Sequence, residues 1–165
     1  MGRAIGAFER VLLTPARWDR YLEGDETALT DAERRGLREF LGAGCQACHN
    51  GPYLGGRMFQ RVGVVQPWPV TTDLGRVAVT RLPADSLVFK VPGLRNIAQT
   101  GPYFNHGNVP ALDAGVELMA RHQLGRELTE AQIASIMTFL GALTGRLPAA
   151  YVTPPPSLRS AGGGS

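Results

Sequence analysis

The sequence of 165 residues has almost no lysine and no long apolar run, and both absences exclude classes of protein. Lys90 is the single lysine beside sixteen arginines, and these cations are spread along the chain instead of forming the basic stretch typical of nucleic-acid binding. No segment approaches the roughly 20 consecutive apolar residues that a membrane-spanning helix needs. With 44% hydrophobic residues, the composition suits one globular domain with attachments. We therefore expect neither a nucleic-acid partner nor a membrane span.

The first residues also lack the continuous apolar block and small-residue cleavage site of a secretory signal, because Glu9 and Arg10 interrupt the apolar positions early. The last four residues, Gly-Gly-Gly-Ser, have the composition of a linker. We therefore expect the sequence to be a mature or excised form of a longer product.

Two capping boxes mark the starts of helices. Thr30 is followed three residues later by Glu33, and Thr129 by Gln132, so in each pair a hydroxyl and a longer side chain can satisfy amides at a helix start. The first helix is expected to end in the glycine-rich stretch before the first cysteine, and the second at Gly145. The buried stripe of the second helix is expected to comprise Ile133, Ile136, Met137, Leu140 and Leu143.

Helical spacing predicts two further helices. Residues 4–13 place apolar side chains on one face and are followed by a Thr-Pro pair that closes the segment. Residues 111–121 repeat the i, i+3, i+4 spacing. These four helices, with little regular strand pattern, indicate a mainly α fold.

The middle of the chain, residues 50–92, is interrupted by glycines and prolines and has no long periodic element. Only valine-rich pieces at 62–65 and 77–79 could pair as strands. Irregular stretches of this length are uncommon in a compact domain unless something other than helices and sheets supplies the core on which they pack. A large prosthetic group would supply such a core.

The strongest chemical signal is the pentapeptide Cys45-Gln46-Ala47-Cys48-His49, which holds both cysteines of the chain. Two thiols three positions apart can each form a thioether to one porphyrin, and the adjacent imidazole can then bind the iron. A thioredoxin-like redox pair would need a strand before the motif, where a helix is expected. A zinc site would need two further ligands, and only His106 and His122 are available. The motif therefore favours covalent attachment of haem c.

A sixth iron ligand must come from elsewhere in the chain. His/Met ligation would raise the reduction potential, whereas two histidines would lower it. Met137 lies on an expected core stripe, and a methionine on a helix face usually serves packing. The residues alone leave the choice open among Met58, Met119, Met137, His106 and His122.

Six short motifs occur in a fixed order: AIGAFER at 4–10, DRYL at 19–22, CQACHNG at 45–51, FKVPGLRN at 89–96, TGPYF at 100–104 and QLG at 123–125. Together they resemble the C-terminal half of bacterial di-haem cytochrome c peroxidases, over roughly residues 4–147. In that family this half holds the electron-accepting, high-potential haem. The resemblance implies a class I cytochrome c-like haem domain with long irregular loops.

The resemblance also carries residue roles. It implies Met119 as the sixth ligand, and backbone carbonyls of Thr100 and Pro102 as part of a calcium site between two haem domains. Two carbonyls are far short of the six to eight oxygens that calcium takes, so the others would come from water and a second domain. The chain departs from the family at Asn105-His106, where the usual order is His-Asp, so the family's histidine role cannot be transferred to His106.

The domain expectation has three parts: an N-terminal helix and linker over 1–25 that packs on a partner domain, a haem domain over 26–147, and an extended tail over 148–165. The expected function is electron acceptance for a di-haem peroxidase-like protein that reduces hydrogen peroxide in the periplasm. The donor would be a small cytochrome c or copper protein, and a homodimer is an open alternative. The peroxidatic haem domain is absent from this sequence, so the chain alone should be a poor peroxidase.

Two other functions remain open. The first is a free-standing monohaem cytochrome c carrier, in which the apolar face of residues 4–13 should be covered. The second is a haem-free thiol or zinc protein. Smaller roles are also open: Pro92 could fix the imidazole through its carbonyl, and three arginines could hold haem propionates. These arginines are Arg57, Arg95 and Arg121.

Overall fold

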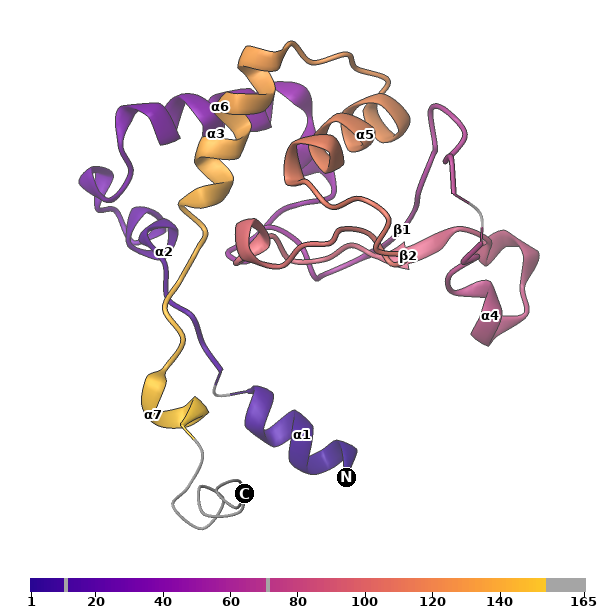
Figure 1. The fold of residues 1–165 in the computed structure, drawn as a ribbon, viewed down its shortest axis with the longest axis horizontal. Helices are drawn as coiled ribbons and strands as arrows, with labels where there is room; N and C mark the ends of the chain where they lie inside the picture. Colours follow the sequence, from indigo (N-terminus) through magenta and orange to yellow (C-terminus); the bar gives the residue numbers. More distant parts are fainter. Residues whose placement is uncertain (11, 71, 154–165) are drawn as a thin grey trace, which may run out of the picture.

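The computed structural model describes residues 1–10, 12–70 and 72–153, and its regular structure is mainly helical (Figure 1). The expected mainly α fold is therefore confirmed. Short 3-10 turns cover Glu26–Ala28, Cys45–Ala47, Pro83–Asp85 and Ile97–Gln99. In chain order, the other elements are α1 (Gly2–Glu9), α2 (Arg17–Leu22), α3 (Asp31–Ala43), β1 (Phe59–Arg61), α4 (Val77–Thr80), β2 (Val88–Lys90), α5 (Leu112–Leu124), α6 (Glu130–Gly141) and α7 (Ala149–Val152).

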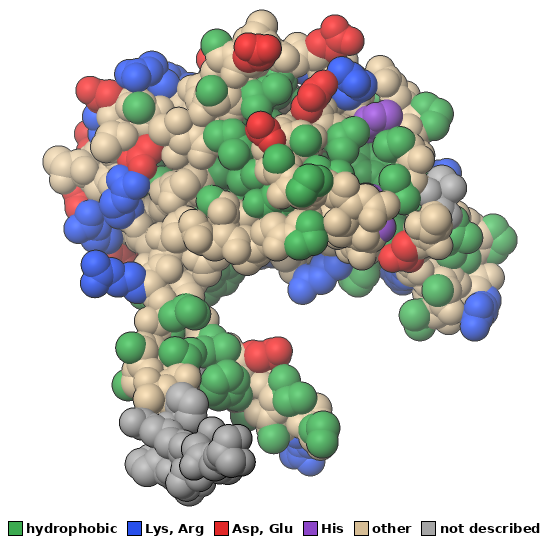
Figure 2. All heavy atoms as spheres, viewed as in Figure 1, with side chains coloured by type: hydrophobic (Ala, Val, Ile, Leu, Met, Phe, Trp, Pro, Cys, Tyr) green, Lys and Arg blue, Asp and Glu red, His purple; other side chains and the backbone are tan. Residues whose placement is uncertain are grey.

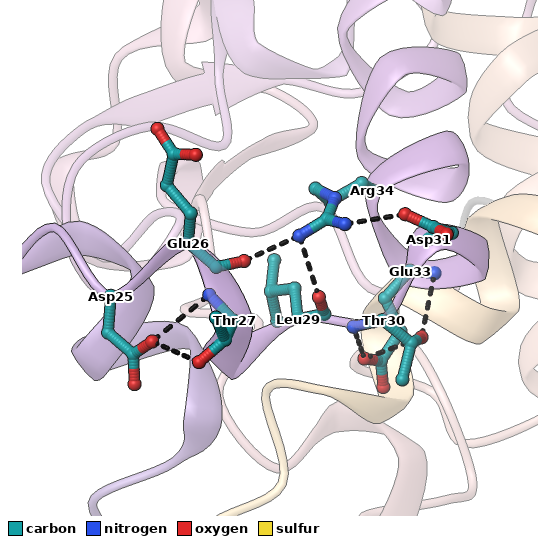
Figure 3. Close-up of polar contacts among 8 residues, drawn as sticks. All are labelled: Asp25, Glu26, Thr27, Leu29, Thr30, Asp31, Glu33 and Arg34. Atoms are coloured by element: carbon teal, nitrogen blue, oxygen red, sulfur yellow. Dashed lines mark hydrogen bonds and ion pairs between the residues drawn. The ribbon is translucent and has the colours of Figure 1, made fainter.

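Helix α3 begins at the expected capping box. The Thr30 amide donates to Glu33 Oε2 at 2.8 Å, and the Glu33 amide donates to Thr30 Oγ1 at 3.3 Å. Figure 3 shows Arg34 reaching back to the preceding turn, where its guanidinium donates to the Leu29 carbonyl at 3.0 Å. Gly44 ends the helix with a left-handed φ of 95°. Glycine adopts this conformation without steric cost because it has no Cβ. The helix therefore delivers the chain directly to Cys45.

Helix α6 begins at the second capping box, as expected, where the Gln132 amide donates to Thr129 Oγ1 at 3.3 Å. It ends at Gly141, earlier than the expected Gly145, because tighter turn bonds take over at Ala142 and Leu143. Gly145 serves close packing instead: a Cβ there would lie 2.0 Å from the carbonyl oxygen of Thr14. The glycine therefore allows the N-terminal segment to cross the end of α6.

The core lies where α3 and α6 cross. A Cβ at Gly36 of α3 would lie 2.0 Å from the Ser135 carbonyl oxygen of α6, so only glycine allows the two backbones this close. Phe139 is fully buried at the crossing, with its ring centroid 5.4 Å from that of Phe40 and 5.5 Å from that of Trp18. The expected stripe on α6 omitted Phe139, which the structure places at its centre.

Residues 14–22 pack on this core. The Asp19 carboxylate binds the Arg95 guanidinium, with an N–O distance of 2.5 Å, and Arg95 also donates to the Thr14 carbonyl at 2.8 Å. Trp18 is buried, and its indole N–H donates to the Pro52 carbonyl at 3.0 Å. The segment before α3 is thereby fastened to the loop that follows the pentapeptide.

The expected strand pair at 62–65 and 77–79 is wrong. The antiparallel pair is β1 with β2, in a register that places Gln60 opposite Phe89. Residues 77–80 form α4 instead, because the Thr80 and Arg81 amides bond back to Arg76 and Val77 and close a helical turn. Valine content indicated strand but carried no information on these local bonds.

Helices α1 and α7 extend together away from the main body (Figure 1). Their only aromatic contact among the described residues joins Phe8 to Tyr151, with ring centroids 5.6 Å apart. No residue of Gly2–Glu9 is buried, and Figure 2 shows apolar side chains gathered on this part of the surface.

The extended tail expected over 148–165 is wrong for 149–152, which are helical, and 154–165 lie outside the described residues. Within the described ranges, no helix combines the length and apolar character needed to cross a bilayer.

Two ion pairs make the free energy of unfolding depend on pH in the acid range. Hydrogen bonds from Arg95 hold the pKa of Asp19 below its usual value. Burial alone would raise the pKa of Glu33, but hydrogen bonds from Arg17 and Thr30 outweigh burial and lower it. Each carboxylate therefore stabilises the fold above its unfolded pKa of about 4, and this stability is lost as pH falls through the lower folded pKa.

We therefore expect the contribution of these two carboxylates to the free energy of unfolding to be flat from pH 7 to 5 and to fall below about pH 4. Urea titrations across this range would measure the change. Asp19→Asn should lower stability at pH 7 by about 1–3 kcal/mol, because it leaves Arg95 without its partner, and should weaken the acid dependence. Asp113→Asn, at an exposed position, is the matched control and should leave both unchanged. An acid dependence equal in all three proteins would contradict this assignment.

Candidate haem site

The pentapeptide forms one tight turn directly after α3. The amides of Cys48 and His49 both donate to the Cys45 carbonyl, at 3.3 and 2.9 Å. A single turn of backbone therefore carries both thiols and the imidazole, and neither thiol is in a disulfide. This local geometry follows from Gly44, whose left-handed conformation ends α3 and starts the turn.

The turn forms part of the lining of a largely apolar cavity. The other walls come from β1, β2, the loop before α5, and helices α5 and α6. Met119 of α5 belongs to this lining together with Cys45, Cys48 and His49, so the structure brings the four predicted haem-binding residues to one cavity. Apolar lining residues include Phe40, Trp68, Phe89, Leu112, Val116, Ile136 and Leu140.

Backbone carbonyls orient the His49 ring. Its Nδ1 lies 3.3 Å from the Leu54 carbonyl oxygen, and the Pro92 carbonyl also interacts with the ring, as the sequence suggested. Burial lowers the pKa of His49, so the imidazole is neutral at pH 7. A neutral ring that donates from Nδ1 leaves the lone pair of Nε2 for a metal.

Gly55 makes this arrangement possible. Its φ of 132° is one that side chains rarely adopt, and a Cβ there would lie 2.1 Å from the Pro92 carbonyl oxygen and 3.3 Å from His49 Nδ1. The Gly55-Gly56 pair marks a turn in the sequence but not the backbone that this turn approaches. The role of the Leu54 carbonyl had no such signal, because any residue supplies a carbonyl.

We expect Gly55→Ala to disturb His49 without unfolding the chain. The backbone strain of about 1–3 kcal/mol would be relieved by moving Leu54 and Pro92 away from the ring. The expected result is weakened axial ligation, measured as a high-spin fraction in the ferric absorption spectrum. Gly42→Ala is the matched control, because nothing lies within 4 Å of its Cβ. Ligation that is identical in the two variants would refute the role given to Gly55.

The two thiols are poorly suited to the alternative chemistries. Burial raises the pKa of Cys45 to about 11 and also raises the pKa of Cys48, so both are protonated at pH 7. A redox-active pair needs thiolates, and a zinc site needs further ligands beside the two cysteines. Within the described residues, no group of three or more His, Cys, Asp or Glu side chains could hold a metal ion. The site therefore favours thioether formation over metal binding by sulfur.

Two of the five candidate sixth ligands line the cavity. They are Met119 and His106, whereas Met58, Met137 and His122 are outside the lining. His106 Nδ1 accepts a hydrogen bond from the Asn108 amide at 3.1 Å. An amide N–H can only donate, so the neutral ring carries its proton on Nε2 and has no lone pair there for iron. Met119 is then the candidate whose ligand atom is available.

The C-terminal end of α5 holds the loop after β1 against the cavity. The Gln123 side chain accepts from the Gly63 amide and donates to the Arg61 carbonyl, both at 3.0 Å. The His122 carbonyl accepts from the amides of Val65 and Gln66 at 3.1 Å. Sequence analysis assigned the QLG motif no structural role, because these contacts join residues about sixty positions apart.

The arginines considered as propionate partners do not line the cavity. Arg95 pairs with Asp19, and Arg121 pairs with Glu117 within α5. Arg61 and Lys90 are the cationic side chains of the lining, and both are exposed. Sequence reasoning missed them because nothing in their neighbours distinguishes them from other surface cations.

The carbonyl-bearing residues expected at a calcium site are exposed. Thr100 and Pro102 lie on the turn that follows the 3-10 segment Ile97–Gln99. The Thr100 hydroxyl donates to the Ile97 carbonyl at 3.4 Å. Both residues therefore lie at the surface of this chain, as a site shared with a second domain would require.

The chain is similar to bacterial cytochrome c peroxidases. It is 46% identical over 147 residues to cytochrome c551 peroxidase of Nitrosomonas europaea, covering 88% of this chain and 44% of that protein. It is 44% identical to cytochrome c peroxidase Ccp of Escherichia coli, covering 86% of this chain and 32% of the relative. A solved MauG-like protein associated with microbial copper homeostasis matches with a TM-score of 0.67 and 25% identity, covering 86% of this chain and 51% of that one. No family model matches.

The expected resemblance to cytochrome c peroxidases is therefore confirmed over most of the chain, and so is the fold class. The chain spans less than half the length of these two peroxidases. It is homologous to one part of each relative, and relatives of this kind imply a haem c cofactor.

Proposed function

We propose that this chain is the electron-accepting haem domain of a di-haem cytochrome c peroxidase-like protein. The observation that carries the proposal is the joint placement of Cys45, Cys48, His49 and Met119 in one apolar cavity. The thiols would hold haem c covalently, and His49 and Met119 would be its axial ligands. A haem bound in this way supplies a one-electron couple with a raised potential.

The residues of the cavity support electron transfer over peroxide chemistry. Peroxide reduction needs an open position at the metal, and a pair of axial side chains leaves none. The apolar walls and the carbonyls behind His49 keep the ligands fixed, so little rearrangement accompanies a change of charge. The peroxidatic haem would then lie in a second domain outside this chain, and a small cytochrome c or copper protein would be the donor, in the periplasm.

The proposal is tested by mixing the haem-loaded chain with a reduced small cytochrome as electron donor and hydrogen peroxide. We expect reduced donor to reoxidise slowly in the presence of the chain, at a rate far below that of the Nitrosomonas europaea relative measured side by side. The chain should still accept electrons rapidly from a reduced small cytochrome. Peroxide turnover equal to that of the relative would contradict the division of roles.

The second candidate, a free-standing monohaem carrier, is disfavoured by α1. Ile5 and Phe8 are 51% and 45% exposed, although a self-sufficient protein should cover this apolar face. Packing on a second domain or a homodimer would cover it. Light scattering of the haem-loaded chain distinguishes these two ways of covering the face, because a dimer would cover it with a second copy and a monomer would leave it for a second domain.

Calcium would join the two domains through the carbonyls of Thr100 and Pro102. This chain alone offers too few oxygens, so we expect weak calcium binding by calorimetry, in the millimolar range or weaker. Tight binding by the chain alone would contradict a shared site.

A further inference from the structure

His106 presents a buried polar atom that the function described above does not use. Its Nε2 has no hydrogen-bond partner among the described residues, and the ring lines the haem cavity. Because the Asn108 amide donates to Nδ1, Nε2 carries the proton and is a donor. A buried donor without an acceptor destabilises the structure, so an acceptor is expected inside the cavity.

The surrounding loop holds the ring in place. The Tyr103 amide donates to the Val109 carbonyl at 2.7 Å and closes the loop at its base. The His106 ring lies 5.9 Å from the Phe104 ring, and Phe104 packs edge-on against buried Trp68 at 4.9 Å. These contacts fix the position of the donor before any ligand enters.

We propose that His106 Nε2–H donates a hydrogen bond to a propionate carboxylate of the bound haem and holds that end of the group in the cavity. The inference rests on the proposed function, since it needs haem. The periphery of haem c is otherwise apolar, so its two carboxylates are the acceptors that it offers. Arg61 and Lys90 also line the cavity, but they are exposed, whereas a buried neutral donor binds a carboxylate without competition from water.

The test compares His106→Leu, which removes the donor, with His106→Gln, which retains a side-chain N–H of similar reach. A propionate with no donor keeps its full negative charge near the iron, which favours the ferric state. In His106→Leu we expect the ferrous-to-ferric ratio at fixed ambient potential to fall about threefold to tenfold, where tenfold equals 59 mV. Resonance Raman should show a shifted propionate bending mode. His106→Gln should stay within about twofold of the native ratio.

His122→Phe is the matched control. His122 also has a buried, unpartnered ring nitrogen, but it is outside the cavity lining and packs edge-on against Trp68 at 5.6 Å. We expect its potential and propionate mode to be native. If His106→Leu does not accumulate with haem, His106→Ala, which also removes the donor, takes its place: the same fall in ratio and shifted mode support the proposal, and native values overturn it.

A native potential and propionate mode in His106→Leu would overturn the inference, and so would equal losses in His106→Gln and His106→Leu. Neither result touches the proposed function, which fails if the wild-type chain takes up no covalent haem, shows no methionine ligation or turns over peroxide as fast as the relative.

Discussion

Met119→Ala is expected to abolish the sulfur-to-ferric-iron charge-transfer band of the haem-loaded chain and to convert the iron to a high-spin state. The side chain belongs to the cavity that contains the cysteines and His49, and a thioether favours ferrous iron. Its loss should lower the reduction potential by about 0.1 V or more, within the range of roughly 0.8 V that axial ligands control. Absorption and redox titration of the same sample measure both effects.

Met58→Ala and Met137→Ala are the matched controls. Both make the same change of side chain outside the cavity lining, and both should keep the band and the potential. A band that persisted in Met119→Ala would assign the ligand to another methionine and contradict the account of the site. A wild-type chain with no such band would instead point to a nitrogen ligand or to an open position.

Phe139→Ala is expected to cost about 3–5 kcal/mol of unfolding free energy, the range for removing a buried aromatic side chain. The ring has no exposed surface and contacts both Phe40 and Trp18, so α6 would lose its packing on α3 and on the N-terminal segment together. Native domains are stable by only about 5–15 kcal/mol. The variant should therefore be close to unfolding, measured as a lower urea midpoint with an unchanged slope.

Phe59→Ala is the control, because Phe59 is 53% exposed on β1 and the chemical change is identical. Its ring makes a cation–π contact with Arg76 at 5.1 Å, so we expect its stability to fall by about 1 kcal/mol or less. Equal losses in the two variants would show that the crossing of α3 and α6 is not the main source of stability.

Local signals in the sequence predicted the local structure well. The two capping boxes predicted the starts of α3 and α6, because the atoms involved belong to residues three apart. The pentapeptide likewise indicated one turn bearing two thiols and an imidazole. In these cases all the interactions that determine the structure lie within a few neighbouring residues.

Contacts between distant segments were harder to predict. The pairing of β1 with β2 depends on register across almost thirty residues, and Gly145 was interpreted as a helix end although it serves close packing on Thr14. The Leu54 carbonyl behind His49 is invisible in a sequence because every residue has one. The choice of sixth ligand between Met119 and His106 depended on a contact seen only in the structure. The Asn108 amide donates to His106 Nδ1 and thereby determines the tautomer of that ring.

The most direct test of the account is to ask whether the pigment stays with the polypeptide. The chain should be produced in a host that attaches haem c, denatured and extracted with acidified organic solvent, and its intact mass measured. We expect the colour to remain with the protein and the mass to exceed the polypeptide by one haem, with Cys45→Ser and Cys48→Ser together abolishing both. A colourless protein, or pigment released into the solvent, would contradict covalent attachment at Cys45 and Cys48.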